Sequence, residues 1–120
     1  MKNIGLILSG LFCLYSCTTK DIKKEELILD SGDSIKQVVL RTDEKNIFNL
    51  NLLIKGEISG SGQLSIGEND SAVYRTYDVR NGQTEIKYSG DWYSKSCYVT
   101  FRSTTKTNGQ LKFEADFAGD

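Results

Sequence analysis

Histidine and proline are absent from this 120-residue chain, and cysteine occurs only three times. Without histidine, the chain cannot build a Ser-His-Asp triad, a Cys-His dyad or an imidazole metal site. Positive charge is not in excess either, since 15 Lys and Arg stand against 16 Asp and Glu. A nucleic-acid-binding protein needs a clearly basic face. We therefore expect a protein that is not an enzyme, holds no cofactor or metal and binds no nucleic acid.

The N-terminal residues differ in composition from the rest of the chain. Lys2 is followed by an uncharged, mostly apolar stretch from Ile4 to Tyr15 (IGLILSGLFCLY). A transmembrane helix needs about 20 apolar residues, so this stretch is too short to span a bilayer. It has the length of the hydrophobic region of a signal peptide. The sequence therefore predicts a signal peptide over residues 1–16.

The end of this stretch, Leu14-Tyr15-Ser16-Cys17, resembles the lipobox of bacterial lipoproteins. In that family the cysteine thiol receives a diacylglyceryl group, and cleavage makes this cysteine the new N-terminus. Leu14, Ser16 and Cys17 match the aliphatic, small and acceptor positions, whereas Tyr15 departs from the small or aliphatic residue usual there. The resemblance implies a lipid on Cys17 and a cell-envelope location, expected at the outer membrane on its periplasmic or surface-exposed face. An ordinary secretory signal or a buried N-terminal helix is the alternative.

The segment after this cysteine predicts a tether. Residues 18–26 (TTKDIKKEE) contain one apolar residue and charges of both signs, so they bury too little surface to offset their ordering entropy. We expect a lipidated Cys17 and flexible tether over residues 17–26 and a single domain over residues 27–120. Once the signal peptide is removed and Cys17 is lipidated, Cys97 is the only thiol left, which excludes an intramolecular disulfide.

Beyond the tether, apolar residues recur with a period of two, which is typical of strands. One parity holds Phe48, Leu50, Leu52, Ile54 and Ile58, and residues 111–117 alternate between apolar and charged side chains. The glycines at 60 and 62 predict a turn that makes 47–66 a hairpin. The Asn-Gly pair at 81–82 predicts a hairpin with a type I′ turn, and the pair at 108–109 predicts a second Asn-Gly turn.

About seven or eight such strands follow one another, with turn signals every 8–12 residues and no sustained helical pattern. This spacing predicts an all-β fold, a single antiparallel β-sandwich with Greek-key or jelly-roll-like connectivity. A small closed barrel is the alternative.

The densest aromatic segment, YSGDWY, covers residues 88–93. Exposed aromatic rings pack on the apolar C–H faces of sugars, and a carboxylate accepts hydrogen bonds from their hydroxyls. Asp91, Trp92 and Tyr93 therefore form a candidate ligand-binding cluster, which Tyr74 and Tyr77 would extend. The alternative is that Trp92 plugs the end of the sandwich core, as large aromatic residues do in small β-domains.

Two acidic segments are candidates for calcium sites, namely Asp30 and Asp33 in LDSGDS and Glu68 and Asp70 in GENDS. Calcium needs six to eight oxygen ligands, and neither segment has the spacing of an EF-hand loop. Ordinary turns use the same residue types, so no metal site is assigned. Cys97 shares a strand parity with Val99 and Phe101, which predicts a buried apolar residue and not a nucleophile.

Three functional hypotheses follow. The first is a lipid-anchored envelope protein, a non-catalytic protein-binding or structural module that acts through a sandwich face or an edge strand. The second is a glycan-binding accessory lipoprotein that uses the Asp91-Trp92-Tyr93 cluster. The third is an inhibitor or immunity-type envelope protein that shields its host from a secreted enzyme. A sandwich fold by itself does not choose among them.

Overall fold

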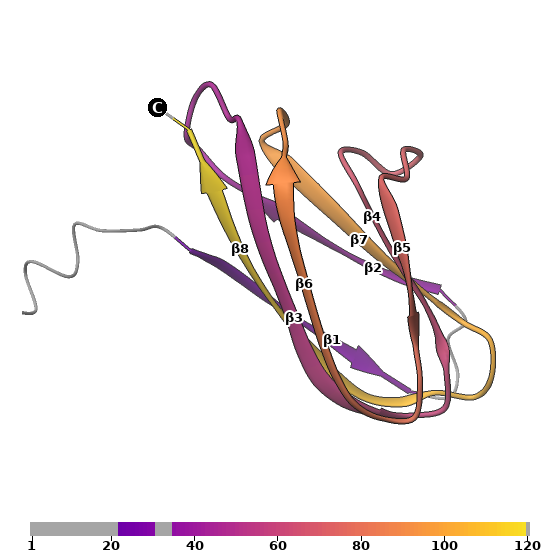
Figure 1. The fold of residues 1–120 in the computed structure, drawn as a ribbon. Helices are drawn as coiled ribbons and strands as arrows, with labels where there is room; N and C mark the ends of the chain where they lie inside the picture. The colour runs from indigo at the N-terminus through magenta and orange to yellow at the C-terminus, as the bar shows by residue number, and fades with distance from the viewer. Residues whose placement is uncertain (1–21, 31–34, 120) are drawn as a thin grey trace, which may run out of the picture.

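The computed structural model describes residues 22–30 and 35–119, and every regular element in these ranges is a strand (Figure 1). No helix there is long and apolar enough to cross a membrane. The strands are β1 (Lys23–Leu29), β2 (Ile35–Arg41), β3 (Asn49–Ser59), β4 (Gly62–Gly67), β5 (Arg75–Val79), β6 (Gly82–Asp91), β7 (Ser96–Ser103) and β8 (Asn108–Ala118).

These eight strands form two antiparallel sheets of four. The first sheet has the order β1-β8-β3-β6, and the second sheet has the order β2-β7-β4-β5. Consecutive strands therefore alternate between the sheets except at β4 and β5, which is the connectivity of a jelly roll. The predicted β-sandwich is confirmed. The barrel alternative is wrong, because no strand pairing joins the two sheets within the described residues.

The turns predicted around residues 60–62 and 81–82 lie between strands, but the predicted hairpins are wrong. The turn predicted at Asn108-Gly109 is also wrong, because both residues belong to β8 and pair with β3. β3 pairs with β6 and β8 and β4 pairs with β5 and β7, so residues 47–66 cross between the sheets. The Asn81-Gly82 pair also marks a crossing, since β5 and β6 belong to different sheets. Gly82 has a φ of +114°, but Asn81 is not in the positive-φ region that a type I′ turn requires. Burial of the inner faces of two sheets is a tertiary effect that overrides this local signal.

Strand β1 takes in four residues that the sequence assigned to the tether. It pairs with β8 along its whole length, from Lys23 opposite Ala115 to Leu29 opposite Gly109. Only Leu27 and Leu29 of this strand are buried. Composition could not reveal the strand, because it is held largely by backbone hydrogen bonds at a sheet edge. Cys17, the signal peptide and tether residues 18–21 lie outside the described residues.

The core lies between the sheets and contains the inward side chains of both. Cys97 is fully buried as a free thiol, as predicted. Burial raises the pKa of this thiol to about 12, so it stays protonated at neutral pH. The buried hydrophobic residues are Leu27, Leu29, Leu40, Ile47, Leu50, Leu52, Ile54, Ile58, Leu64, Ile66, Val79, Tyr88, Trp92, Cys97, Val99, Phe101, Leu111, Phe113, Ala115 and Phe117.

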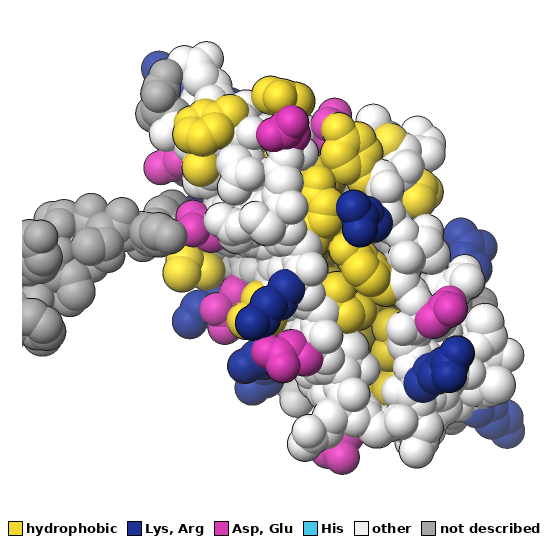
Figure 2. Space-filling view, in the orientation of Figure 1, with side chains coloured by type: hydrophobic (Ala, Val, Ile, Leu, Met, Phe, Trp, Pro, Cys, Tyr) yellow, Lys and Arg dark blue, Asp and Glu magenta, His cyan; other side chains and the backbone are white. Residues whose placement is uncertain are grey.

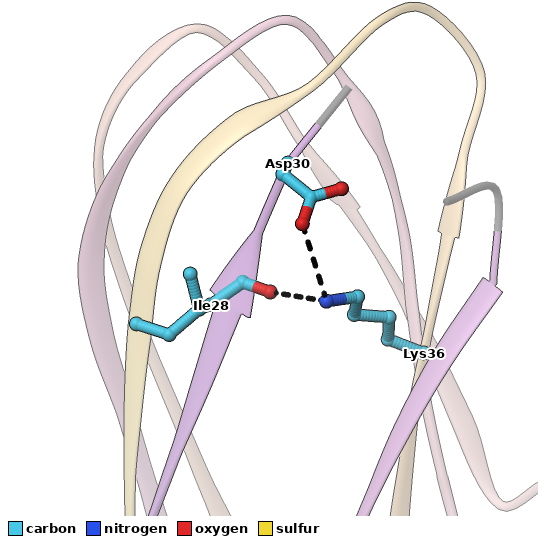
Figure 3. A network of polar contacts seen from close by, with 3 residues as sticks. All are labelled: Ile28, Asp30 and Lys36. Carbon is cyan, nitrogen blue, oxygen red and sulfur yellow. Dashed lines mark hydrogen bonds and ion pairs between the residues drawn. The ribbon is translucent and has the colours of Figure 1, made fainter. Parts of the chain in front are cut away.

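The two lateral sides of the sandwich differ. On one side, the closed side, β1 and β2 contact each other. Here the Nζ of Lys36 donates a hydrogen bond to the carbonyl of Ile28 at 2.8 Å and lies 4.0 Å from the Asp30 carboxylate (Figure 3). On the other side, the open side, β5 and β6 make no comparable contact within the described strands. Tyr77 and Ile86 are only partly buried there, and Figure 2 shows a hydrophobic stripe between these two strands.

Candidate binding surface at the loop end

Three loops, over residues 42–48, 68–74 and 92–95, lie together at the end of the sandwich where β8 ends (Figure 1). Four of the seven large hydrophobic residues that the structure exposes belong to these loops. Phe48 is 54 % exposed, Val73 62 %, Tyr74 50 % and Tyr93 66 %. We call these four side chains the loop-end patch. Hydrophobic side chains are visible along this end of the molecule in Figure 2.

Trp92 lies beneath the patch and is completely buried. Its Nε1 donates a hydrogen bond to the carbonyl of Ser96 at 2.9 Å, and its backbone N–H donates to the carbonyl of Phe48 at 3.3 Å. Its ring meets those of Tyr74 and Tyr88 edge to face, with centroids 5.1 and 6.0 Å away. An indole with its ring packed and its N–H satisfied belongs to the core. The interpretation of Trp92 as an exposed sugar platform is therefore wrong.

The other members of the predicted cluster are divided between core and surface. Tyr77, on β5, packs partly buried against the core. Asp91 and Tyr93 flank Trp92 and are exposed, and Tyr74 is half-exposed. The structure thus brings Tyr74 to Trp92, as the sequence suggested, while only Asp91, Tyr93 and Tyr74 present substantial surface to solvent.

Phe48 and Val73 were not predicted as surface residues of a site. The parity of the following strand suggested that Phe48 is buried, but β3 begins only at Asn49. The backbone N–H of Phe48 donates to the carbonyl of Ala118 at 2.9 Å, which fixes the residue beside the end of β8. No signal in the sequence distinguishes an apolar residue before a strand from one inside it. Val73 lies in a loop, where nothing local predicts exposure.

Tyr88, on β6, contacts both Trp92 and Arg75, the first residue of β5. Its hydroxyl donates to the backbone carbonyl of Asp91 at 3.4 Å, and the guanidinium carbon of Arg75 lies 5.9 Å from its ring centroid. Burial, with a contribution from Tyr74, raises the pKa of Tyr88 above its ordinary value, although Arg75 lowers it. The phenol is therefore a neutral structural group at physiological pH.

A groove of about 240 Å³ lies on the outer face of the second sheet. The loop after β4 forms one side of it. This loop lies close to the strand, because the carbonyl of Ala72 packs where a Cβ on Gly67 would lie. The side chains of Asn69, Ser71 and their neighbours shape this loop, in which the Oδ1 of Asn69 accepts hydrogen bonds from two backbone N–H groups. The groove is lined in part by Gln37, Asp70, Tyr98, Thr100 and Arg102.

The acidic segments do not form a metal site in the part of the chain that the structure covers. No group of three or more Cys, Asp or Glu residues there is arranged to hold a metal ion. Asp30 lies beside Lys36, and Asp33 is outside the described residues. The segment around Glu68 and Asp70 is a turn organised by Asn69.

No family model matches the chain, and no curated protein matches it in sequence. Among solved structures, the chain is similar to a mitogen derived from Yersinia pseudotuberculosis, with a TM-score of 0.50 and 11 % identity over 84 % of this chain and 89 % of that one. A coat protein of Tobacco streak virus gives a TM-score of 0.44 and 9 % identity over 85 % of this chain and 88 % of that one. At these identities the likeness to the mitogen supports the fold alone.

Proposed function

We propose that this protein is a lipid-anchored, non-catalytic binding module of the cell envelope that takes a protein partner on the loop-end patch. The observation that carries the binding surface is the concentration of Phe48, Val73, Tyr74 and Tyr93 at one end of the sandwich. Exposed large apolar side chains that gather at one end of a domain are typical of interaction sites. The anchor rests on the lipobox resemblance around Cys17.

A protein partner suits this patch better than a sugar does. Phe48 and Val73 carry no side-chain hydrogen-bonding group, whereas sugars need several such groups around each ring. Aromatic side chains in a desolvated centre are typical of protein interfaces. The buried Trp92 beneath Tyr74 holds the patch on a rigid base, which lowers the ordering cost of association.

The anchor is tested by fractionation. Cys17→Ala removes the acceptor thiol, and we expect the full-length variant to leave the membrane fraction under low and high salt. Two or more acyl chains give stable attachment, whereas a protein without them has only weak surface contacts. A variant that remains in the membrane fraction under both conditions would contradict the lipoprotein proposal.

The binding surface is tested by photocross-linking in intact cells. A photoreactive phenylalanine analogue replaces Tyr93 in the patch or, as a control, Ile28 on β1, which is 55 % exposed. We expect a discrete protein adduct from position 93 that disappears with Phe48→Ser, and none from position 28. Equal adducts at both positions, or none at either, would contradict the proposal. An adduct with a secreted enzyme would identify the protein partner as an enzyme and favour the inhibitor or immunity-type role.

A glycan is the second candidate ligand, because the exposed residue Asp91, at the end of β6, is two residues from the exposed Tyr93. The groove lined by Gln37, Thr100 and Arg102 offers further hydrogen-bonding groups. A ligand at 100 times its dissociation constant adds about 2.7 kcal/mol to the free energy of unfolding, which a thermal-shift screen of a glycan panel detects. A shift that is lost in Tyr93→Ala would favour this alternative.

A further inference from the structure

Strand β6 has a free edge. It pairs with β3 on one side, and no strand pairs with its other side among the described residues. It is ten residues long, from Gly82 to Asp91, and pairs with β3 in regular register from Gly82 opposite Ile58 to Asp91 opposite Asn49. A long, regular edge strand is a template for another strand unless its side chains prevent pairing.

The charges on β6 match a second copy of the same strand. Glu85 and Lys87 point to the outer face of the first sheet, where they lie opposite Lys55 and Leu53 of β3. In a symmetric antiparallel pair centred on Ile86, Glu85 of each copy lies opposite Lys87 of the other. Opposite charges in such cross-strand pairs stabilise a sheet, and like charges destabilise it.

Neighbouring registers lack this match. Centring the pair on Glu85 places two carboxylates opposite each other, and centring it on Lys87 places two ammonium groups opposite each other. The register about Ile86 also uses nine of the ten residues of the strand, with Gly82 opposite Gly90. The same operation on β1, the other edge of this sheet, places Glu26 opposite Glu26 at its central residue. Length and charge therefore favour β6 and one register.

The open side supplies apolar surface for the same contact. Ile86 and Tyr77 are only partly buried against the core, and Figure 2 shows the hydrophobic stripe between β5 and β6. A second copy of β6 at this edge places Ile86 opposite Ile86 and Thr84 opposite Tyr88 on the inner face. The contact therefore extends the cover over the edge of the core while it satisfies the backbone groups of β6.

We propose that β6 of one copy pairs antiparallel with β6 of a second copy about a two-fold axis through Ile86, which joins their first sheets into one continuous sheet. The interface is isologous, so one set of residues supplies both sides. This contact is separate from the loop-end patch and does not depend on the proposed function.

The experiment is disulfide cross-linking of the full chain in intact cells, read as a doubled mass on a non-reducing gel. Ile86→Cys places two thiols opposite each other at cross-strand spacing, which is within disulfide reach. Thr84→Cys keeps the same strand and face but lies four residues from its own copy. We expect Ile86→Cys to cross-link at least about tenfold faster than Thr84→Cys, because thiols held beyond about 7 Å between Cα atoms do not bridge.

Two controls measure collisions and background. Ile28→Cys on β1 replaces an exposed side chain and reports random encounters between copies. The wild-type chain reports any cross-linking through Cys13, Cys17 or Cys97.

Charge reversal tests the register. In the Ile86→Cys chain, Glu85→Lys places a second ammonium group opposite that of Lys87, and we expect the cross-linked dimer to fall to the level of Thr84→Cys. Adding Lys87→Glu restores opposite charges and should restore the dimer. Glu26→Lys, the same charge change on the β1 edge, should have no effect. Equal cross-linking at positions 84 and 86, no dimer at position 86, or failure of the double reversal to rescue would overturn the proposal.

Discussion

The closed and open sides of the sandwich differ in how the edge of the core between the two sheets is covered. On the closed side, β1 and β2 contact each other and Lys36 reaches from one sheet to a backbone carbonyl of the other. On the open side, β5 and β6 make no comparable contact within the described strands, and Trp92, Tyr74, Tyr88 and Arg75 connect them near the loop end. A jelly roll can therefore cover its core with its own side chains along one edge and leave the other edge available for association.

The largest effect is expected at Trp92, which bridges the open side. Its ring contacts Tyr88 on β6 and Tyr74 just before β5, so Trp92→Ala removes the connection and leaves a cavity. We expect the free energy of unfolding to fall by about 3–5 kcal/mol, measured by urea denaturation. Tyr93→Ala is the matched control, because this neighbouring ring is 66 % exposed, and its effect should stay within about 0.5 kcal/mol. Similar losses in both variants would contradict the assignment of Trp92 to the core.

The next prediction compares a glycine of β8, an interior strand, with a glycine of β6, the strand at the open edge. Gly109 and Gly82 each follow an asparagine at the start of a strand and have φ values of +138° and +114°. A Cβ on Gly109 would clash with the carbonyl of Glu57, whereas nothing lies within 4 Å of one on Gly82. Gly82→Ala should cost about 1–2 kcal/mol from backbone strain, and Gly109→Ala about 3 kcal/mol because the clash adds to it. Equal losses in thermal or urea denaturation would show that β8 is no more tightly packed than β6.

The thiol of Cys97 reports on burial beside the closed side, since it lies opposite Leu40 of β2. The unfolded thiol loses its proton near the ordinary pKa of 9.0, while the folded thiol keeps its proton up to about pH 12. The folded state therefore binds more protons between these values, and the contribution of Cys97 to the free energy of unfolding falls as the pH rises through them. The pH dependence of urea unfolding above pH 9 should be weaker in Cys97→Ala than in the wild type. The same slope in both would contradict the burial of this thiol.

The smallest effect concerns the closure by Lys36. Lys36→Met keeps the aliphatic stem but removes the hydrogen bond to Ile28 and the ion pair with Asp30, which should cost about 1 kcal/mol. Lys55→Met removes an ion pair with Glu85 in which both side chains are more than half exposed, and this change should cost less than about 0.5 kcal/mol. Urea denaturation of the two variants compares them directly. An equal or larger loss in Lys55→Met would mean that Lys36 does not hold the closed side.

The sequence predicted the strands and the buried Cys97 because period-two alternation reports directly on which face of a strand is buried. Phe113 and Phe117 of β8 show this clearly, since both are buried as their spacing predicts. Pairing could not be predicted in the same way. Which strand lies beside β3 depends on how two apolar faces pack, and that information is spread over the whole chain. The Asn81-Gly82 pair therefore marked a turn correctly but suggested the wrong partner for β6.

The candidate site was predicted only in part for a related reason. The sequence placed Trp92, Tyr93 and Tyr74 in one cluster, and the structure brings the Tyr74 and Trp92 rings into contact. It could not tell that Trp92 is the buried member and Tyr93 the exposed one, because adjacent residues in a loop have no fixed period. Phe48 was assigned to the core by extending the alternation of β3 one residue beyond its start.

Amide hydrogen exchange at several protein concentrations tests whether the β6 edge is open in one copy and covered by a second. We predict that protection of the segment 82–91 rises with concentration, while that of β1, the opposite edge of the same sheet, does not change. The strand then behaves as an edge only in the monomer. Protection of residues 82–91 that is the same at every concentration and unaffected by Glu85→Lys would contradict the account.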